Sequence, residues 1–87
     1  MKALAGKAVA FHERIEITSK RTTREKLLTY LAIRARASGK SSFEIPFNRQ
    51  ELADYLEVER SGLSVEIGKL IRCGMIDADR KTFTVYF

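Results

Sequence analysis

The stretch from Asn48 to Gly74, NRQELADYLEVERSGLSVEIGKLIRCG, is the feature that most constrains how this chain can fold. Asn48 is followed three residues later by Glu51, which is the capping-box pattern that opens a helix. Pro46 disfavours an earlier helical start. A second helix is expected over residues 60–73, and Gly74 is suited to end it in the left-handed conformation. The spacing therefore predicts two short helices joined by a tight turn.

The faces of these helices differ in character. The first helix has an apolar stripe at helical spacing, formed by Leu52, Ala53 and Leu56. The corresponding stripe of the second helix is Leu63, Ile67, Leu70 and Ile71. Its opposite face is small and polar, with Ser61, Val65, Gly68 and Arg72, and with Ser64 toward one edge. A solvated helix usually carries long Lys and Glu side chains there, so we interpret this face as one that another body approaches closely.

Residues 22–87 resemble the C-terminal DNA-binding domain of the Crp/Fnr transcription regulators. The blocks RQELADYL and RSGLSVEIGKL, at this spacing and followed by a short β-hairpin, carry the resemblance. It implies a mostly α fold with a small antiparallel β wing, that is, a winged helix-turn-helix preceded by a dimerisation-type helix. In that family the second helix of the motif lies in the DNA major groove.

The resemblance also implies which residues contact DNA. The expected base contacts are Arg60, Ser61, Ser64 and Val65. The expected phosphate contacts are Asn48, Arg49, Gln50, Lys81 and Thr82. Two positions depart from the family pattern. Glu57 stands where the turn usually has Gly, which predicts a strained or altered left-handed turn. Val65 stands where relatives often have Arg, which replaces a guanine contact with an apolar one that suits a thymine methyl group.

The N-terminal segment, residues 1–19, reads as a helix. Its apolar residues Leu4, Ala8, Phe11 and Ile15 follow a heptad spacing. Periodicity alone allows either a dimer seam or a helix packed on its own domain. The resemblance favours a homodimer, weak in this chain because the seam covers little more than two heptads. We therefore expect residues 1–20 to be the end of a dimerisation helix with its hinge, and residues 21–87 to be the DNA-binding domain.

Two further elements complete the predicted fold. Thr22 and Glu25 form a capping box for a helix that should reach Ser38, with Gly39 as its C-terminal cap. Its inward residues are expected to be Leu27, Leu28, Leu31, Ala32 and Ala35. Residues 42–47 alternate as a short strand, and residues 76–87 alternate as a hairpin around a basic turn. The hairpin should place Phe83, Val85 and Phe87 on one face.

Composition sets the broad class. The chain has 87 residues, 45% of them hydrophobic, which allows one small globular domain. No apolar run is long enough for a membrane span, and the N-terminus lacks the pattern of a signal peptide. The single cysteine, Cys73, is expected to be a buried thiol in a reducing cytoplasm.

The net charge of +5 favours a polyanionic partner. The distribution of charge does not single out the helix pair at residues 48–74 as the DNA-binding part. Residues 1–40 carry a net charge of +7, whereas residues 41–74 carry −2. Placement of a few cations matters more than segment totals, since phosphate contacts need only well-aimed side chains.

The residue pattern offers no catalytic site, no metal site and no cofactor site, which indicates that the chain is not an enzyme. Double-stranded DNA is the expected partner, with RNA polymerase as a further one and no membrane. The sensor domain of full-length Crp/Fnr regulators is absent from these residues, so the chain is either an excised C-terminal piece or a short regulator. The alternative function is a winged helix used for contacts with another protein.

Overall fold

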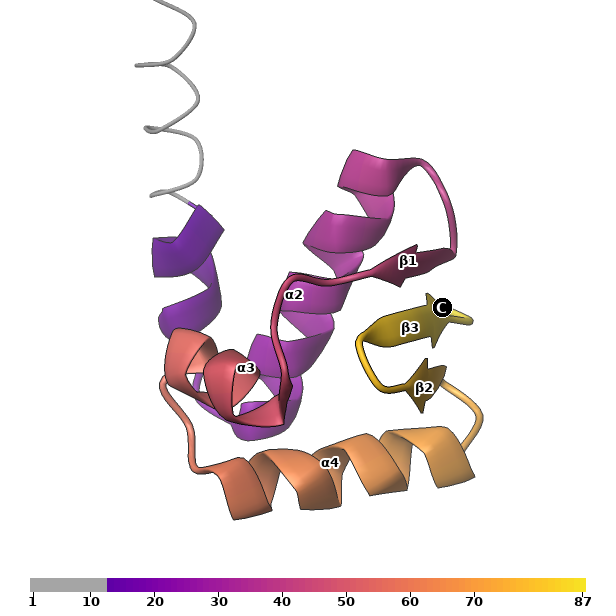
Figure 1. Ribbon diagram of the computed structural model, residues 1–87. Helices are drawn as coiled ribbons and strands as arrows, with labels where there is room; N and C mark the ends of the chain where they lie inside the picture. Colours follow the sequence, from indigo (N-terminus) through magenta and orange to yellow (C-terminus); the bar gives the residue numbers. More distant parts are fainter. Residues whose placement is uncertain (1–12) are drawn as a thin grey trace, which may run out of the picture.

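The computed structural model of the protein describes residues 13–87 (Figure 1). Residues 13–18 are helical and lead into the main elements. In chain order these are α2 (Thr23–Ser38), β1 (Ser42–Glu44), α3 (Arg49–Leu56), α4 (Arg60–Arg72), β2 (Ile76–Asp79) and β3 (Thr82–Val85). This order is that of a winged helix-turn-helix, as the sequence predicts.

Helix α2 begins and ends at the predicted residues. The Glu25 N–H donates to Thr22 Oγ1 over 3.1 Å, and the Thr22 N–H donates to Glu25 Oε1 over 3.1 Å. Both bonds of the capping box are therefore formed, which satisfies donors that have no partner within the helix. Gly39 ends α2 with φ 70°, a conformation that Gly adopts without a Cβ clash.

The turn between α3 and α4 passes through a left-handed residue. Asn48 and Glu51 close the second capping box with two bonds of 2.8 Å. Helix α3 then ends at Glu57, which has φ 60° and ψ 48°. A side chain in this region costs roughly 1–2 kcal/mol because Cβ approaches the following carbonyl. The left-handed turn expected at this position is present, although the residue is not Gly.

The sheet has the order β1-β3-β2 and is antiparallel throughout. Strand β3 pairs with β2 through Ile76↔Val85 and Asp79↔Thr82, which leaves Arg80 and Lys81 as the turn of the wing. The expected strand over residues 42–47 is shorter than predicted, because β1 stops at Glu44. Pro46 has no N–H to donate to a ladder, and Ile45 instead donates to the Lys81 carbonyl over 2.9 Å.

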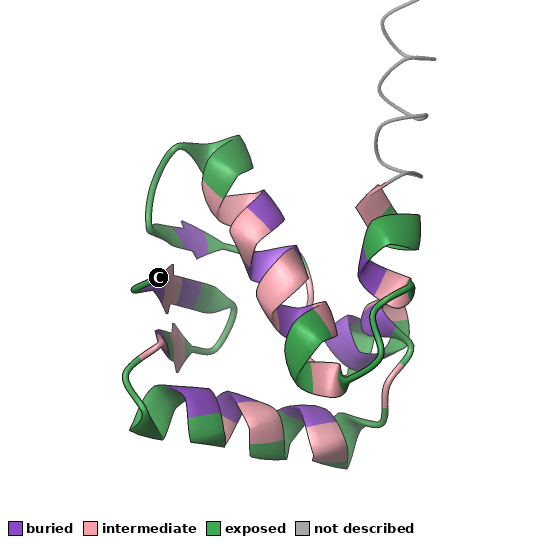
Figure 2. Cartoon of the chain, turned by 180° about the vertical axis from the view of Figure 1, so that it is seen from behind, coloured by how far each residue is buried: buried purple, intermediate pink, exposed green. Residues whose placement is uncertain are grey.

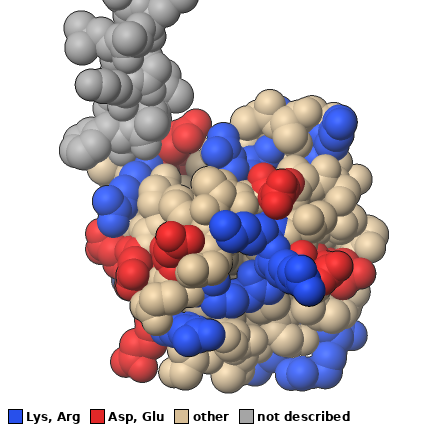
Figure 3. Space-filling model, in the orientation of Figure 1, with Lys and Arg blue, Asp and Glu red and all other residues tan. Residues whose placement is uncertain are grey.

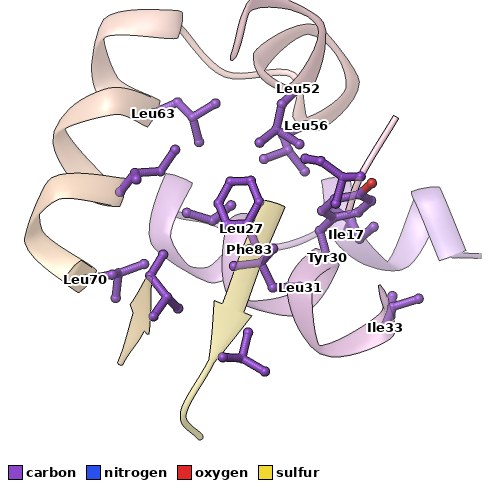
Figure 4. Packing of buried hydrophobic residues seen from close by; sticks show 14 of the residues in the cluster. Ile17, Leu27, Tyr30, Leu31, Ile33, Leu52, Leu56, Leu63, Leu70 and Phe83 are labelled. Carbon is purple, nitrogen blue, oxygen red and sulfur yellow. The ribbon is translucent and has the colours of Figure 1, made fainter. Parts of the chain in front are cut away.

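The core lies where the three helices meet the inner face of the sheet. Figure 4 shows the Phe83 ring in the middle of the cluster, near Leu27, with Leu63 and Leu56 reaching it from the helix pair. Tyr30 and Ile33 are also buried, although the predicted stripe of α2 did not include them. Leu27 and Leu31 are fully buried as predicted, whereas Leu28, Ala32 and Ala35 are only partly covered.

The helical residues 13–18 pack against α3. Ile17 is 1% exposed and belongs to the core. Arg14 lies with its guanidinium carbon 5.2 Å from the centroid of the Tyr55 ring, and its Nη2 lies 3.7 Å from Glu57 Oε2. Ile15 points away and is 50% exposed. The other three residues of the predicted seam, Leu4, Ala8 and Phe11, lie outside the described residues.

Two sequence-based expectations about burial are wrong, and the predicted hairpin is too long. Ile71 is 38% exposed, because it lies at the edge of α4 rather than on the stripe that faces the core. The alternation predicted as far as Phe87 stops earlier, since β3 ends at Val85, and Phe87 is exposed. Cys73 is an exposed free thiol at the C-terminal cap of α4, which ends at Arg72.

Candidate nucleic-acid interface

Helix α4 buries one face and exposes the other. Leu63, Ile67 and Leu70 point into the core, whereas Val65 is 54% exposed. Figure 2 shows this division along the helix, which lies at the margin of the molecule with no other element beyond it. The outer face identified in the sequence is therefore uncovered among residues 13–87.

A hollow of about 520 Å³ lies at one edge of this face. It is bounded by the start of α3, the start of α4 and the tip of the wing. Its lining residues are Asn48, Arg49, Gln50, Arg60, Arg80 and Lys81. Four of these six side chains are cationic and none is acidic, so the hollow is suited to bind an anion.

The cations of this hollow come from distant parts of the sequence. Figure 3 shows Lys and Arg side chains gathered across the middle of the face on which α3, α4 and the wing meet, with acidic side chains to either side. Within the described residues, Arg60, Arg80 and Lys81 have no carboxylate within ion-pairing distance. Their charges are therefore available to a ligand, with only solvent and counterions to neutralise them in the free protein.

Arg49 differs from its neighbours because its guanidinium is already engaged. Its Nη1 donates to the Arg80 carbonyl over 3.0 Å, and its guanidinium carbon lies 5.0 Å from the centroid of the Phe83 ring. Burial in this position lowers the pKa of Arg49 from its ordinary value. Arg49 thus joins the first turn of α3 to the wing.

A second hollow, of about 400 Å³, borders the opposite edge of the same face. It is lined by Thr22, Thr23, Arg24, Ser61, Gly62, Val65 and Glu66. Successive residues of a helix are rotated by about 100°, which places Arg60 and Gly62 on opposite sides of α4. The exposed face of α4 therefore lies between a hollow near the wing and one at the start of α2.

The two glycines of α4 have no packing role that the described residues reveal. A Cβ built at Gly62 would meet nothing within 4 Å, and one built at Gly68 would meet only the end of the Arg72 side chain at 3.4 Å. Close packing of α4 against α3 therefore does not explain either glycine. Each Gly weakens the helix by roughly 1 kcal/mol relative to Ala.

The start of α3 offers two free backbone donors. The Asn48 side chain and N–H are both used by the capping box with Glu51. Within residues 13–87, the N–H groups of Arg49 and Gln50 have no acceptor. Helix α4 begins without a side-chain cap at Glu59. Uncapped N–H groups at a helix start favour anions, because they carry the positive end of the helix dipole.

The structure brings most of the predicted contact residues together. Asn48, Arg49, Gln50, Arg60 and Lys81 line the first hollow, and Ser61 and Val65 line the second. Ser64 and Thr82 are exposed but line neither. Arg80 also lines the first hollow and was not among the predicted contacts, although it belongs to the basic turn of the hairpin. Thr22, Thr23 and Arg24 line the second hollow and were not predicted either. The available signal was the cation of Arg24, two residues after the capping Thr22.

No helix within residues 13–87 is both long and apolar enough to cross a membrane. In the same part of the chain, no group of three or more His, Cys, Asp or Glu side chains is placed to hold a metal ion.

Two helices joined by a tight turn, a basic hairpin and an open face on the second helix define a winged helix-turn-helix of the DNA-binding class. Residues 25–86 match the Crp-like helix-turn-helix domain, and the chain belongs to this family. It is 31% identical to the transcriptional activator protein FnrL of Cereibacter sphaeroides over 85 residues, which cover 87% of this chain and 34% of that protein. The chain thus spans about a third of the length of this relative. It is a DNA-binding domain of the kind that bacterial transcription regulators carry.

Proposed function

We propose that α4 enters the major groove of duplex DNA and reads base edges there. The observation that carries the proposal is the exposed face of α4 between two hollows, one of which holds four cations. The major groove admits one helix and has a phosphate strand on either side. A helix with a cationic hollow along one edge and a second hollow along the other matches this geometry.

The base contacts would come from the outer face of α4. Arg60 presents a guanidinium that can bond O6 and N7 of guanine together. Val65, exposed one turn after Ser61, offers an apolar surface to a thymine methyl group. Ser61 and Ser64 complete the set of base-reading residues with hydroxyl groups, which donate to or accept from either base type.

The phosphate contacts would fix the register of α4 on the duplex. Asn48, Arg49 and Gln50 line the first hollow at the start of α3, where the N–H groups of Arg49 and Gln50 would bind a phosphate. Lys81 at the wing tip, followed by Thr82, would bind the same strand further along. These contacts carry no sequence information of their own, but they set where Arg60 meets the bases.

The regulator would act as a homodimer on an operator with two-fold symmetry. Ile15 supports this arrangement, because it is exposed on the helical segment whose Ile17 is anchored in the core. Leu4, Ala8 and Phe11 would continue the contact. Half-sites would then lie about one helical turn, roughly 34 Å, apart. Contact with RNA polymerase and a cytoplasmic location belong to the same proposal.

Selection of binding sites from random duplex DNA tests the proposal, using the chain both alone and as a covalently linked dimer. The expected product is a short motif, repeated in two-fold symmetry for the linked dimer. Arg60→Ala should lower affinity by about 1–3 kcal/mol and relax the preference at one position. Arg36→Ala is the matched control, because Arg36 is exposed on α2 and lines neither hollow. An unchanged motif for Arg60→Ala would remove Arg60 from the base-reading set.

Salt dependence separates this function from the alternative, a winged helix that contacts another protein. Binding to phosphates releases counterions, so the affinity for DNA should fall steeply as salt rises. A contact centred on Val65 and the small residues of α4 would depend on salt only weakly. Failure to retain any duplex at low ionic strength would favour that alternative.

A further inference from the structure

The wing tip is held by the segment that leads into α3. Two carbonyl groups of the turn accept bonds from this segment: the Ile45 N–H donates to Lys81 over 2.9 Å, and Arg49 Nη1 donates to Arg80 over 3.0 Å. The Lys81 carbonyl is thus bonded to the residue after β1, and the Arg80 carbonyl to the first residue of α3. Strand β1 already pairs with β3 as far as Glu44↔Thr82, and these two bonds extend that attachment to the turn itself.

The turn itself is strained, and its charges repel. Arg80 has φ 56°, a left-handed conformation that costs a non-Gly residue roughly 1–2 kcal/mol. Arg49, Arg80 and Lys81 also line the same hollow as like charges. Repulsion between them would push the tip away from α3 in the free protein. The bond from Arg49 opposes this motion, and a charge-assisted hydrogen bond is stronger than a neutral one.

We infer that the Arg49 side chain is a positioning residue, which holds the wing tip so that Lys81 and Arg80 meet the phosphates bound by the start of α3. The inference rests on the proposed DNA-binding function and deepens it. Arg49 sits over the Phe83 ring at 5.0 Å, so its direction is set by the core. The backbone N–H of Arg49 would donate to a DNA phosphate, while its side chain donates to the Arg80 carbonyl of the wing.

Hydrogen exchange of the free protein tests, without DNA, whether the bond from Arg49 to the Arg80 carbonyl holds the wing tip. Arg49→Met keeps a long apolar stem on Phe83 but removes the donor and the charge. Exchange of the Ile45 amide, which bonds the Lys81 carbonyl at the tip, should then rise about tenfold. The Val85 amide bonds Ser41 at the far end of the sheet and is the internal control, expected to stay unchanged. An Ile45 amide that exchanges at the wild-type rate would overturn the inference.

A double-mutant cycle on DNA affinity tests the consequence. Lys81→Ala should weaken binding several-fold in the wild-type chain and reduce the salt slope by about 1. In Arg49→Met it should weaken binding less than about twofold, because the tip no longer reaches its phosphate. Equal losses in both backgrounds would show that Arg49 and Lys81 act independently, and the inference would be wrong while DNA binding stood.

Arg49→Lys covers the case in which Arg49→Met does not fold. It keeps the charge but lacks the planar fork that reaches the Arg80 carbonyl over the Phe83 ring. In Arg49→Lys, as in Arg49→Met, we expect Lys81→Ala to weaken DNA binding by less than about twofold. If Arg49→Lys binds DNA as tightly as the wild-type chain and Lys81→Ala costs the same affinity in both, Arg49 is not a positioning residue. If the wild-type chain and its linked dimer bind no duplex, the proposed function fails and this inference fails with it.

Discussion

Arg24 Nε lies 3.2 Å from Glu66 Oε2, which joins the start of α2 to the middle of α4. Lys69 Nζ lies 3.8 Å from the other carboxylate oxygen of Glu66. Among residues 13–87, Glu66 is the one acidic side chain that lines the hollow shared with Ser61 and Val65. Two cations therefore offset an acid that would otherwise repel phosphates beside the exposed face of α4.

Removing Arg24 should weaken DNA binding, because the negative charge of Glu66 would then be offset by Lys69 alone. We expect Arg24→Ala to lower affinity several-fold at low salt, and less at high salt because ions screen the repulsion. Glu66→Gln in the same chain should recover much of the loss. Titration of a fixed duplex at two salt concentrations measures both effects, with Arg36→Ala as the charge-matched control. A double variant as weak as Arg24→Ala alone would mean that Arg24 contacts DNA directly.

Leu63 and Val65 form a matched pair on the two faces of α4. Leu63→Ala should destabilise the protein by about 2–5 kcal/mol, because it opens a cavity in the core. Val65→Ala should change the free energy of unfolding by less than about 0.5 kcal/mol, since Val65 is exposed. Its effect should instead be a changed base preference. Urea unfolding and site selection measure the two outcomes, and a large loss of stability in Val65→Ala would contradict the assigned face.

Replacement of Glu57 by Gly should raise the free energy of unfolding of the protein. The strain of roughly 1–2 kcal/mol at its positive φ disappears, and the greater entropy of Gly in the unfolded chain offsets about 0.5–1 kcal/mol of that gain. The exposed bridge from Arg14 to Glu57 contributes little. Glu57→Ala loses the same bridge but keeps a Cβ, so it should show no gain. Equal urea midpoints for the two variants would point to side-chain charge as the cause.

Tyr30 should make the stability depend on pH in alkaline solution. Burial raises the pKa of Tyr30 to about 12, although the positive charge of Arg34 opposes the shift. Its folded-state pKa thus lies above the ordinary value of 10.0, so the neutral phenol favours the folded protein below pH 10. That contribution should be lost as the pH rises from about 10 to about 12.

The comparison with Tyr30→Phe isolates this effect. The Tyr30 hydroxyl is buried and has no hydrogen-bond partner among the described residues, so Phe should fold as stably at neutral pH. Between pH 10 and pH 12, the stability of the wild-type protein should fall relative to that of the variant. Urea unfolding across this range is the measurement. Parallel curves for the two proteins would show that folding does not raise the pKa of Tyr30.

Local patterns explain how much of the fold was predictable. The capping boxes at Thr22 and Asn48 and the left-handed residues at Gly39 and Glu57 depend on a few neighbouring residues, so the sequence placed them correctly. Burial was less predictable where an element ends. Ile71 and Phe87 continue an apolar pattern, but the core no longer lies beside them. Ile17 and Tyr30 became core residues through packing between segments that periodicity does not connect.

The sequence by itself determined the helix pair, its turn and the small outer face of α4, because spacing and capping act over one or two turns of chain. Only the tertiary structure decided where the charge lies. Residues 41–74 carry a net charge of −2, yet the fold brings Arg49, Arg60, Arg80 and Lys81 around one hollow. Coulomb interaction depends on distance in space, and distances between the start of α3 and the wing are set by packing around Phe83.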